Sequence, residues 1–526
     1  MRKGAIPVVA LLACILAALA GCSQQQNTVR IAGTIQGDAA NSSTSSSATI
    51  APVAGKVICN GTTVKAASDG SYALTVPAAK SYTCVASSPP AYGEQQVIIS
   101  GHTEKSIALN FGTSQAPACQ LNRISFAIDC QRLHFQPGEL HGRVTFTHSG
   151  GPAANINIQC PDLDHYTGTS NDGSVQWVHT RTDSAGFYTL KNISIGSFNC
   201  LAQNAHGDVT MEPITTSPGS NITADLKVCD SNCPPVKYHF GNVMHEDHVY
   251  VIFWLPPSYT FDPANGDAHY ESLIKRYFQD VGGTSFYNIL TQYGDYLGQI
   301  RNTASLAGAW VDTSPYQHCG LSTTNCTPAA ATRADPLLDN DIQSEVGRAV
   351  KANVGWRADA NSSFFVLTGY GAQECITADA NSGCTWKFDN GYCGYHDSFH
   401  INPQDATAPE AIYAYIPDAI TSGATCSFGS GGNFVSPNHD PLADSAINVI
   451  SHEQFESISD PLPNDAPGWY DDVAEHTREG GEIGDKCVTF YGNIGSDGGN
   501  VSLNGHRYIV QGEWSNLSNS CVMSQS

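Results

Sequence analysis

The cysteines constrain this chain most, because they fall into local pairs that suit disulfide bridges. The chain has 18 cysteines, and such a set indicates an oxidising compartment outside the cytoplasm. Spacing predicts five bridges: Cys59 with Cys84, Cys160 with Cys200, Cys229 with Cys233, Cys319 with Cys326, and Cys487 with Cys521. The remaining group of Cys375, Cys384, Cys393 and Cys426 allows several pairings. Zinc binding by these four is the alternative, which their spacing disfavours because it is unlike paired C-x-x-C knuckles.

The N-terminus predicts export and lipid anchoring. Arg2 and Lys3 precede an apolar run over residues 5–19, as in a secretory signal. The run ends in Leu-Ala-Gly-Cys at Cys22, which resembles the lipobox of bacterial lipoproteins, where the cysteine is acylated and becomes the first mature residue. An ordinary cleaved signal with an incidental cysteine is the alternative. Without Cys14 in the signal and Cys22, 16 of the 18 cysteines remain, an even number.

The anchoring implies a membrane partner and an extracytoplasmic location. Each buried methylene of an acyl chain contributes about 0.8 kcal/mol, so several chains on Cys22 would hold the protein at a bilayer. Ser23 after the lipidated residue favours the outer membrane or cell surface. We therefore predict a signal and lipobox over residues 1–22 and a tether over 23–28.

The charge balance excludes one class of partner. The chain carries 25 basic and 48 acidic residues, a net charge of −23. Nucleic-acid binding relies on Lys and Arg to displace counterions, so we expect no nucleic-acid partner. A length of 526 residues predicts several domains rather than one core.

Two repeated strand patterns predict two small all-β sandwich modules, over residues 29–113 and 114–233. In the first, a hairpin-turn signal at Ser68-Asp69-Gly70 separates strand-like runs at 55–59 and 71–76. In the second, residues 182–190 repeat that pattern. Both units resemble the carboxypeptidase-regulatory-like family, marked by a D-x-x-G-x-Y-x-L turn and strand, whose modules are usually spacers and whose superfamily includes carbohydrate binders. We interpret Tyr72 and Tyr188 as core residues.

Beyond Pro234 and Pro235 the pattern changes to a mixed α/β domain over residues 234–526. The apolar run 249–255, bounded by proline, predicts a buried strand. Further strands are expected at 364–367 and 412–416. Helical spacing of apolar residues predicts helices over 273–281 and 338–350.

The chemistry is expected on a third helix that begins after Asp440. Asp440 is a candidate N-cap with Pro441 at the first helical position, and Pro461 ends the helix. His452 and Glu456 lie one turn apart and therefore share a face, where both can reach one cation.

This spacing is the zincin-like pattern with glutamate in place of the second histidine, H-E-x-x-E rather than H-E-x-x-H. It predicts Zn²⁺ held by His452, Glu456 and a third ligand, with Glu453 as the general base. We favour Glu482 as that ligand because glycines around it allow close backbone approach. Asp485 would support the ligands, and Asp460, at a fraying helix end, is an alternative ligand.

Two other interpretations of these polar residues stay open. The glutamates can simply form the solvent-facing side of an amphipathic helix. His396 and His400, on one face of a strand, can approach a metal, although such histidines more often satisfy local hydrogen bonds. There is no G-x-S-x-G elbow and no Gly-rich phosphate loop.

The C-terminal domain resembles the EXORDIUM/phosphate-induced protein family. The resemblance rests on residues 447–491, with His452-Glu453, Glu456, Asp460-Pro461, Gly468-Trp469-Tyr470 and Glu482-Ile-Gly-Asp-Lys-Cys487, and extends to 249–254, 393–396 and 505–521. It implies a secreted, cell-wall-associated protein without an agreed enzymatic reaction. Some plant members replace the His-Glu pair with small apolar residues, whereas this chain retains it. Many members have Asn where this chain has Asp460.

Two functions follow as expectations. The first is a surface-anchored lipoprotein with a zinc-dependent, peptidase-like hydrolase site. The second is a non-catalytic cell-wall or carbohydrate-binding protein with a structural or vestigial metal site, whose partner is wall polysaccharide or an extracellular protein. Calcium favours an all-oxygen ligand shell, so the presence of His452 favours zinc or another transition metal over calcium.

Overall fold

The computed structural model describes the chain from Thr28 onward, with gaps. The described ranges are 28–38, 50–52, 56–59, 62–68, 70–77, 81–88, 92–100, 106–108, 111–112, 121–122, 127–128, 138–161, 177–193, 196–216, 220–319, 325–379, 383–387, 391–402, 410–419, 426–428, 434–475 and 480–526. The predicted signal, Cys22 and the tether to residue 27 lie outside these ranges. No helix within them has the length and apolar character needed to cross a membrane.

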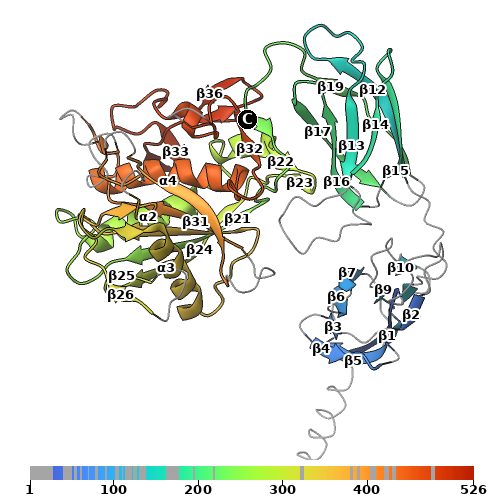
Figure 1. Cartoon of the computed structure of the whole chain (residues 1–526), viewed down its shortest axis with the longest axis horizontal. Coiled ribbons are helices and arrows are strands. Elements are labelled where there is room, and N and C mark those ends of the chain that lie inside the picture. Colours follow the sequence, from blue (N-terminus) through green and yellow to red (C-terminus); the bar gives the residue numbers. More distant parts are fainter. Residues whose placement is uncertain are drawn as a thin grey trace, which may run out of the picture. The chain divides into compact units, whose positions relative to one another are not determined.

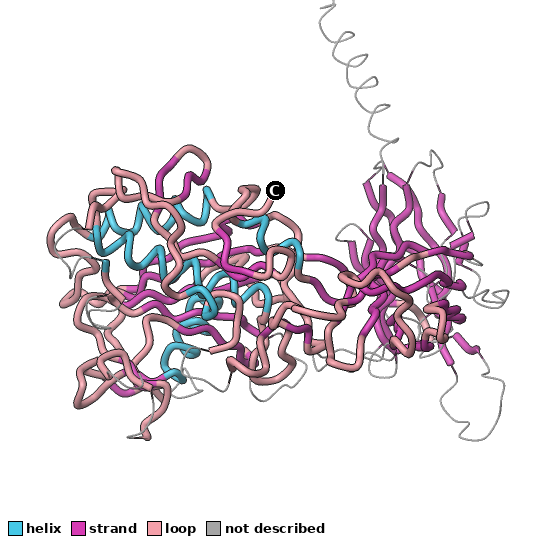
Figure 2. Tube along the Cα trace, turned by 90° about the horizontal axis from the view of Figure 1, so that it is seen from above, coloured by secondary structure: helices cyan, strands magenta, loops and turns pink. Residues whose placement is uncertain are grey.

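The described chain is a multidomain, β-rich protein with few helices and several small sheets. It divides into two compact units, one of Met1–Pro137 with Asp162–Thr169 and one of Gly138–Pro161 with Ser170–Ser526. Figure 2 shows that the described helices gather in one part of the chain, while the rest is strand and loop. The domain boundaries at 113 and 233 stay predictions.

The first unit contains two sheets. One has the order β2-β1-β5, with β8 and β9 parallel to β1, and the other has the order β4-β3-β6-β7. Tyr72 is buried with Leu74 and Val76, as predicted. The bounds are β1 (Thr28–Asp38), β2 (Ile50–Pro52), β3 (Lys56–Cys59), β4 (Thr62–Lys65), β5 (Ser71–Pro77), β6 (Ser81–Ser88), β7 (Tyr92–Ser100), β8 (Ser106–Ala108), β9 (Phe111–Gly112), β10 (Leu121–Asn122) and β11 (Ala127–Ile128).

The hairpin predicted around Ser68 is wrong in its pairing. A further strand, β4, lies between the two predicted strands, and the turn joins β4 to β5 in different sheets. β5 instead pairs antiparallel with β1. A turn signal reports a local change of chain direction, but it does not specify which strand becomes the partner.

The second β-module has the same plan of two sheets, β15-β12-β18 with β19 parallel to β12, and β14-β13-β16-β17. Tyr188 is buried, and its hydroxyl donates to the Ala224 carbonyl at 2.7 Å. Both predicted core tyrosines are therefore confirmed. The bounds are β12 (Gly138–Phe146), β13 (Asn157–Pro161), β14 (Trp177–Arg181), β15 (Phe187–Ile193), β16 (Gly196–Gln203), β17 (Val209–Thr216), β18 (Asn221–Thr223) and β19 (Leu226–Val228).

A five-stranded sheet organises the C-terminal region. Its order is β24 (Ala304–Asp312), β21 (Asp247–Trp254), β28 (Ser362–Thr368), β31 (Glu410–Ile416) and β30 (Tyr395–His400). The first four strands are parallel, and the edge strand β30 runs antiparallel to β31. The central strands are buried on both faces, which explains their continuous apolar runs.

Helices cover both faces of this sheet (Figure 1). Helices α2 (Asp267–Asp280) and α4 (Pro441–Ser459) share a core with one face, and α3 (Asp339–Ala352) packs on the other. The strands and helices predicted for this region from apolar runs and helical spacing are therefore confirmed. Helix α4 contacts β30 and β31, so residues of its polar side face the sheet edge.

The remaining elements are short and build the surrounding loops. They are β20 (Lys237–Tyr238), η1 (Tyr287–Gln292), β22 (Gly294–Asp295), β23 (Gly298–Gln299), β25 (Gln317–His318), β26 (Thr327–Pro328), β27 (Leu337–Leu338), β29 (Glu374–Cys375), β32 (Trp469–Tyr470), η3 (Asp485–Cys487), β33 (Val501–Leu503), β34 (His506–Tyr508), β35 (Glu513–Ser515) and β36 (Ser520–Val522).

Six disulfides link the described residues. Four of them are bridges predicted from spacing, and the open group of four cysteines forms Cys375–Cys384 and Cys393–Cys426. The alternative that these four cysteines bind zinc is therefore wrong, because all four thiols form disulfides. Cys59 and Cys84 lie opposite each other in the β3–β6 register, and their bridge stays a prediction. The disulfides indicate an extracytoplasmic protein.

Asp247, the first residue of β21, gives the fold a pH-dependent stability. It is buried and accepts hydrogen bonds from Ser363 Oγ at 2.6 Å and Gln454 Nε2 at 2.8 Å. Burial raises the pKa of this carboxyl to about 6, although the two hydrogen bonds oppose the rise. The folded state thus binds a proton more tightly than the unfolded state, so ionisation of Asp247 destabilises the fold as pH rises through 6.

We expect Asp247→Asn to remove this pH dependence. Relative to the variant, the wild type should gain about 2 kcal/mol of unfolding free energy between pH 7.5 and pH 4.5, at roughly 1.4 kcal/mol per pKa unit. Urea unfolding at both pH values measures the difference. Glu139→Gln, at a glutamate beside Lys191, serves as the control, because the lysine stays charged over this pH range. Parallel pH profiles for wild type and Asp247→Asn would show that Asp247 does not titrate as described.

Candidate functional site

Helix α4 begins as its sequence predicts. The side chain of Asp440 accepts a hydrogen bond from the Ala443 backbone N–H at 2.9 Å, and Pro441 occupies the first helical position. The helix ends at Ser459, before Asp460 and Pro461. The predicted N-cap and the predicted end of this helix are both confirmed.

The glutamates of α4 do not face solvent. Glu453 and Glu456 are 3% and 2% exposed, and the side chain of His452 is 16% exposed. The amphipathic-helix alternative is therefore wrong, since both acids point into the protein. Burying two carboxylates is costly unless charge or hydrogen bonds compensate, so this helix face requires partners of opposite charge.

His396 of the edge strand β30 enters the same cluster from the sheet side. Its Nδ1 lies 3.5 Å from Glu453 Oε2 and 3.9 Å from Glu456 Oε2. Its Nε2 lies 3.1 Å from the Asp460 carbonyl oxygen and 3.4 Å from Glu482 Oε1. His400, which shares the strand face with His396 in sequence, instead lies at the surface beside Glu410.

The loop before β33 closes the other side of the cluster. His452 Nε2 lies 3.1 Å from Glu456 Oε2 and 3.6 Å from Asp485 Oδ1. The Asp485 backbone N–H donates to Glu456 Oε1 at 2.9 Å. A Cβ on Gly484 would lie 2.7 Å from His452 Nδ1 and 2.9 Å from Glu456 Oε1. Glycine at this position is therefore what lets the loop approach α4.

The two remaining candidate ligands both lie at the cluster. Glu482 contacts His396, and its side chain is 17% exposed. Asp460 is 2% exposed and accepts a hydrogen bond from the Gly468 backbone N–H at 2.7 Å. The expectation that Asp460 sits at a fraying helix end is wrong, because its side chain is buried and hydrogen-bonded and its backbone N–H still donates to the Glu456 carbonyl at 2.7 Å. The structure thus brings the predicted metal, base and supporting residues of the C-terminal region together; their individual roles stay predictions.

Sequence reasoning missed Glu513 of β35. This residue is 0% exposed, and neither carboxylate oxygen has a hydrogen-bond partner. Its charge interacts with those of His452, Glu456 and Asp485, so it belongs to the same cluster. Glu453 Oε2 and Glu482 Oε1 are also buried without a hydrogen-bond partner. No pattern around Glu513 in the sequence marks it as a site residue.

The pKa values reflect an excess of negative charge. Burial raises the pKa of Asp460 to about 7 and of Asp485 to about 8. Burial and the Glu456 charge raise the pKa of Glu482 well above its usual range. Burial alone would lower the pKa of His396, but the Glu453 carboxylate outweighs it and raises that pKa to about 9. The cluster therefore favours positive charge at its centre.

The donor atoms fit a metal ion. One ligand atom from each of His396, Glu453 and Glu456 lies within 4.8 Å of the others, and the same holds for His452, Glu456 and Asp485. Glu456 belongs to both sets. Imidazole nitrogen and carboxylate oxygen are the donors that zinc accepts. Buried oxygens of Glu453, Glu482 and Glu513 have no hydrogen-bond partner. Lys486, the nearest lysine in sequence, pairs instead with Asp471.

Comparison with known proteins supports a relationship for part of the chain. No family model matches it. Protein EXORDIUM-like 5 of Arabidopsis thaliana is 24% identical over 296 residues, which cover 51% of this chain and 68% of that protein. This match supports an EXORDIUM-like relationship for about half of the chain. It agrees with the family resemblance stated from the sequence.

Comparison with solved structures does not assign a fold to this chain. The Bacillus anthracis TIE protein aligns over 38% of this chain and 34% of its own length, with 14% identity and a TM-score of 0.15. A streptococcal ancillary pilin aligns over 38% of this chain and 63% of its own length, with 8% identity and a TM-score of 0.17. Scores this low assign no fold, so the architecture rests on the described elements. The chain is therefore an extracytoplasmic, β-rich protein with an EXORDIUM-like relationship and a buried candidate metal centre.

Proposed function

We propose that this chain is a surface-anchored metalloprotein whose zinc centre, built on α4, hydrolyses peptide-like bonds. One observation carries the proposal: two histidines and an excess of buried carboxylates converge around Glu456, and several of the carboxylate oxygens have no hydrogen-bond partner. An unpaired buried charge costs several kcal/mol, so a divalent cation is the partner that this cluster lacks.

The more exposed set is the better candidate for the catalytic ion. In the set of His452, Glu456 and Asp485, the side chains of His452 and Asp485 are 16% and 23% accessible, whereas His396 and Glu453 of the other set are buried. A bound zinc ion would lower the pKa of a coordinated water toward about 7 and polarise a carbonyl group. His452 and Glu456 would hold the ion, with Glu482 or Asp485 as the third ligand.

Glu453 would act as the general base. It follows His452 in the helix, and its Oε2 has no hydrogen-bond partner, so it is able to accept a proton from attacking water. His396, 3.5 Å from that oxygen, would orient the carboxylate. The packing of α4 against the edge strand β30 supports a zincin-like α/β domain. The β-modules would hold this site away from a membrane to which Cys22 is lipid-linked.

Glu453→Gln is the test of this role. Because the amide keeps the shape but cannot accept the proton, we expect hydrolysis of a peptide library to fall at least about 100-fold while the bound zinc remains. Glu139→Gln, an exposed change in the second β-module, should alter neither property. Unchanged hydrolysis in Glu453→Gln would refute the assignment of Glu453 as base.

A non-catalytic protein with a structural metal is the second candidate. The burial of Glu453 and Glu456 favours it, as does the EXORDIUM-like relationship, which brings no known reaction. Stoichiometric zinc without turnover of any peptide or glycan substrate would support this candidate over the hydrolase.

A further inference from the structure

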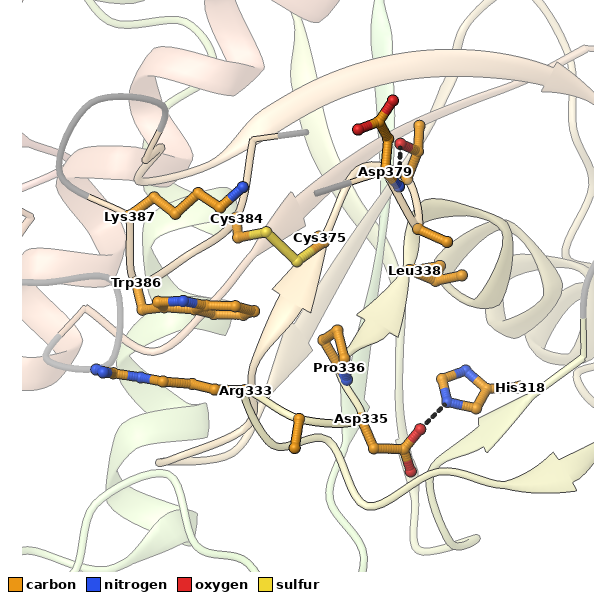
Figure 3. A pocket seen from close by; sticks show the side chains of 13 residues that line it. His318, Arg333, Asp335, Pro336, Leu338, Cys375, Asp379, Cys384, Trp386 and Lys387 are labelled. Carbon is orange, nitrogen blue, oxygen red and sulfur yellow. Dashed lines mark hydrogen bonds and ion pairs between the residues drawn. A yellow bond between two sulfur atoms is a disulfide. The ribbon is translucent and has the colours of Figure 1, made fainter. Parts of the chain in front are cut away.

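Two pockets in the described part of the chain are lined by none of the candidate metal ligands. The smaller one, of about 420 Å³, lies around the start of α3 (Figure 3). There the indole of Trp386 lies between the Cys375–Cys384 disulfide and the Arg333 side chain, so both of its faces are already covered. The larger one has a volume of about 570 Å³, which is within the range of ligand sites.

The walls of the larger pocket come from the second β-module and from the C-terminal region. Strand β17 forms part of one wall, and the segments 234–237 and 516–519 form much of the other. Both walls belong to the same compact unit. Hydrogen bonds join the module to the C-terminal region, because the Asn199 side-chain amide donates to the Asp295 carbonyl at 2.6 Å and the Asn199 backbone N–H donates to the Tyr296 carbonyl at 3.0 Å. Walls that are fixed before binding reduce the ordering cost of a ligand.

Strand β17 is the edge strand of its sheet, and Val209 and Met211 of this strand line the pocket. In the β16–β17 register, Pro213 lies opposite Asn199. Proline has no N–H, and the Asn199 N–H donates to Tyr296 instead, so this pair is not hydrogen-bonded between the strands. Hydrogen-bonded and non-hydrogen-bonded pairs alternate along an antiparallel ladder. The N–H and C=O groups of Met211 and Val209 therefore point away from β16.

These main-chain groups are available to a ligand. Among the described residues, neither the N–H nor the C=O group of Val209 or Met211 forms a backbone hydrogen bond outside its sheet. Both residues are half-buried. An edge strand with unpaired main-chain groups is a template for a further strand. The edge of β17 thus offers alternating donors and acceptors at the spacing that another peptide backbone matches.

The charged groups of this pocket favour an anionic ligand. The chain has a net charge of −23, yet Lys227, Lys237 and His148 line the pocket together with a single acid, Asp208. The Asp208 carboxylate is hydrogen-bonded within its own turn. Lys227 lies beside β17, since its carbonyl accepts a hydrogen bond from Thr210 Oγ1 at 2.7 Å. Its side chain is exposed and forms no hydrogen bond or ion pair among the described residues.

We propose that this pocket binds an extended peptide segment that carries a carboxylate side chain. The segment adds to β17 as a further strand and forms main-chain hydrogen bonds with Val209 and Met211. Its carboxylate pairs with the Lys227 ammonium group. Because the pocket contains no candidate metal ligand, it holds a peptide whether or not the α4 cluster hydrolyses one.

Calorimetric titration of the purified full chain with two matched peptides tests the charge preference. The peptides are acetyl-Thr-Val-Asp-Val-Thr-amide and its counterpart with Asn in place of Asp. We expect the Asp peptide to bind about three- to fivefold more tightly, which is within the range for an exposed ion pair. Lys227→Gln should remove this preference. Lys191→Gln, at an exposed lysine beside Glu139 of the same module, is the matched control and should keep it.

N-methylated versions of the Asp peptide test the strand pairing. An added strand bonds to its neighbour through every second residue. Methylation of one backbone nitrogen should therefore weaken binding at least about tenfold, whereas methylation of the adjacent one should leave the affinity nearly unchanged. Glu453→Gln should give the same affinities as the wild type, so the result does not depend on hydrolysis or on the proposed function of the α4 cluster.

Three outcomes would overturn the proposal, provided that melting curves show each protein to be folded. The first is no binding of the Asp peptide by the wild type at millimolar concentration. The second is an Asp preference that survives in Lys227→Gln, and the third is an equal effect of methylation at adjacent nitrogens. Peptide binding by a chain that takes up no zinc would leave this proposal standing and refute only the metal centre.

Discussion

Glu456→Gln is expected to abolish metal binding, because Glu456 is the one residue shared by both sets of candidate ligands. Its Oε2 lies 3.1 Å from His452 Nε2 and 3.9 Å from His396 Nδ1. We expect zinc affinity, measured by competition with a chromophoric chelator, to fall by more than about 100-fold. That exceeds the upper range for loss of a group that only supports a ligand. Any hydrolytic activity should disappear with the metal.

Two matched variants locate the ion. His452→Gln removes only the more exposed set of ligands, and His396→Gln removes only the buried set. If the ion is catalytic and lies on the exposed side, His452→Gln should lose zinc and His396→Gln should retain most of it. Retention of wild-type affinity in Glu456→Gln would contradict both sets, because neither is complete without that carboxylate.

The second large effect is the loss of stability when metal is removed. The cluster buries Glu453, Glu456 and Glu513. Among the described residues, the positive groups within ion-pair distance of Glu453 and Glu456 are His396 and His452. A ligand present at 1,000 times its Kd stabilises the folded state by about 4 kcal/mol. For the C-terminal region, each kcal/mol shifts the melting temperature by about 2–4 °C. Dialysis against a strong chelator should therefore lower the melting temperature by about 10 °C, and added zinc should restore it.

Glu456→Gln provides the control for that experiment. If the chelator acts through the α4 cluster, it should leave the melting temperature of this variant unchanged. An equal shift in wild type and variant would place the chelator's effect elsewhere in the chain, and no shift in the zinc-loaded wild type would contradict a stabilising ion at this cluster.

Local signals explain what the sequence could predict. The N-cap Asp440, the following Pro441 and the terminating Pro461 define α4 within the chain itself, and continuous apolar runs define the buried strands. Most disulfides follow from proximity in sequence. The spacing of His452 and Glu456 likewise needs only one helical turn, which is why the structure brings these two side chains together.

The features that the sequence left open or missed depend on contacts between distant segments. His396 was one of two histidines named as able to approach a metal, and Glu513 was not named. His396 reaches the cluster only because β30 is the antiparallel edge strand beside α4, whereas His400, on the same strand face, lies at the surface. Gly394 lies two residues before His396, and a Cβ at Gly394 would lie 2.8 Å from Glu453 Oε1. A glycine at this position was the one local signal in the sequence. Glu513 is buried because β35 packs against the loop of residues 480–487. In this contact the Ile483 carbonyl accepts a hydrogen bond from the Trp514 backbone N–H at 2.9 Å. No local pattern encodes that contact.

Elemental analysis of the purified full chain tests the central claim most directly. Metal content is measured after dialysis against buffer without chelator, for wild type and for Glu456→Gln side by side. We predict at least one equivalent of zinc in the wild type and almost none in the variant. A wild-type protein that is folded, free of metal and unable to take up added zinc would contradict the account.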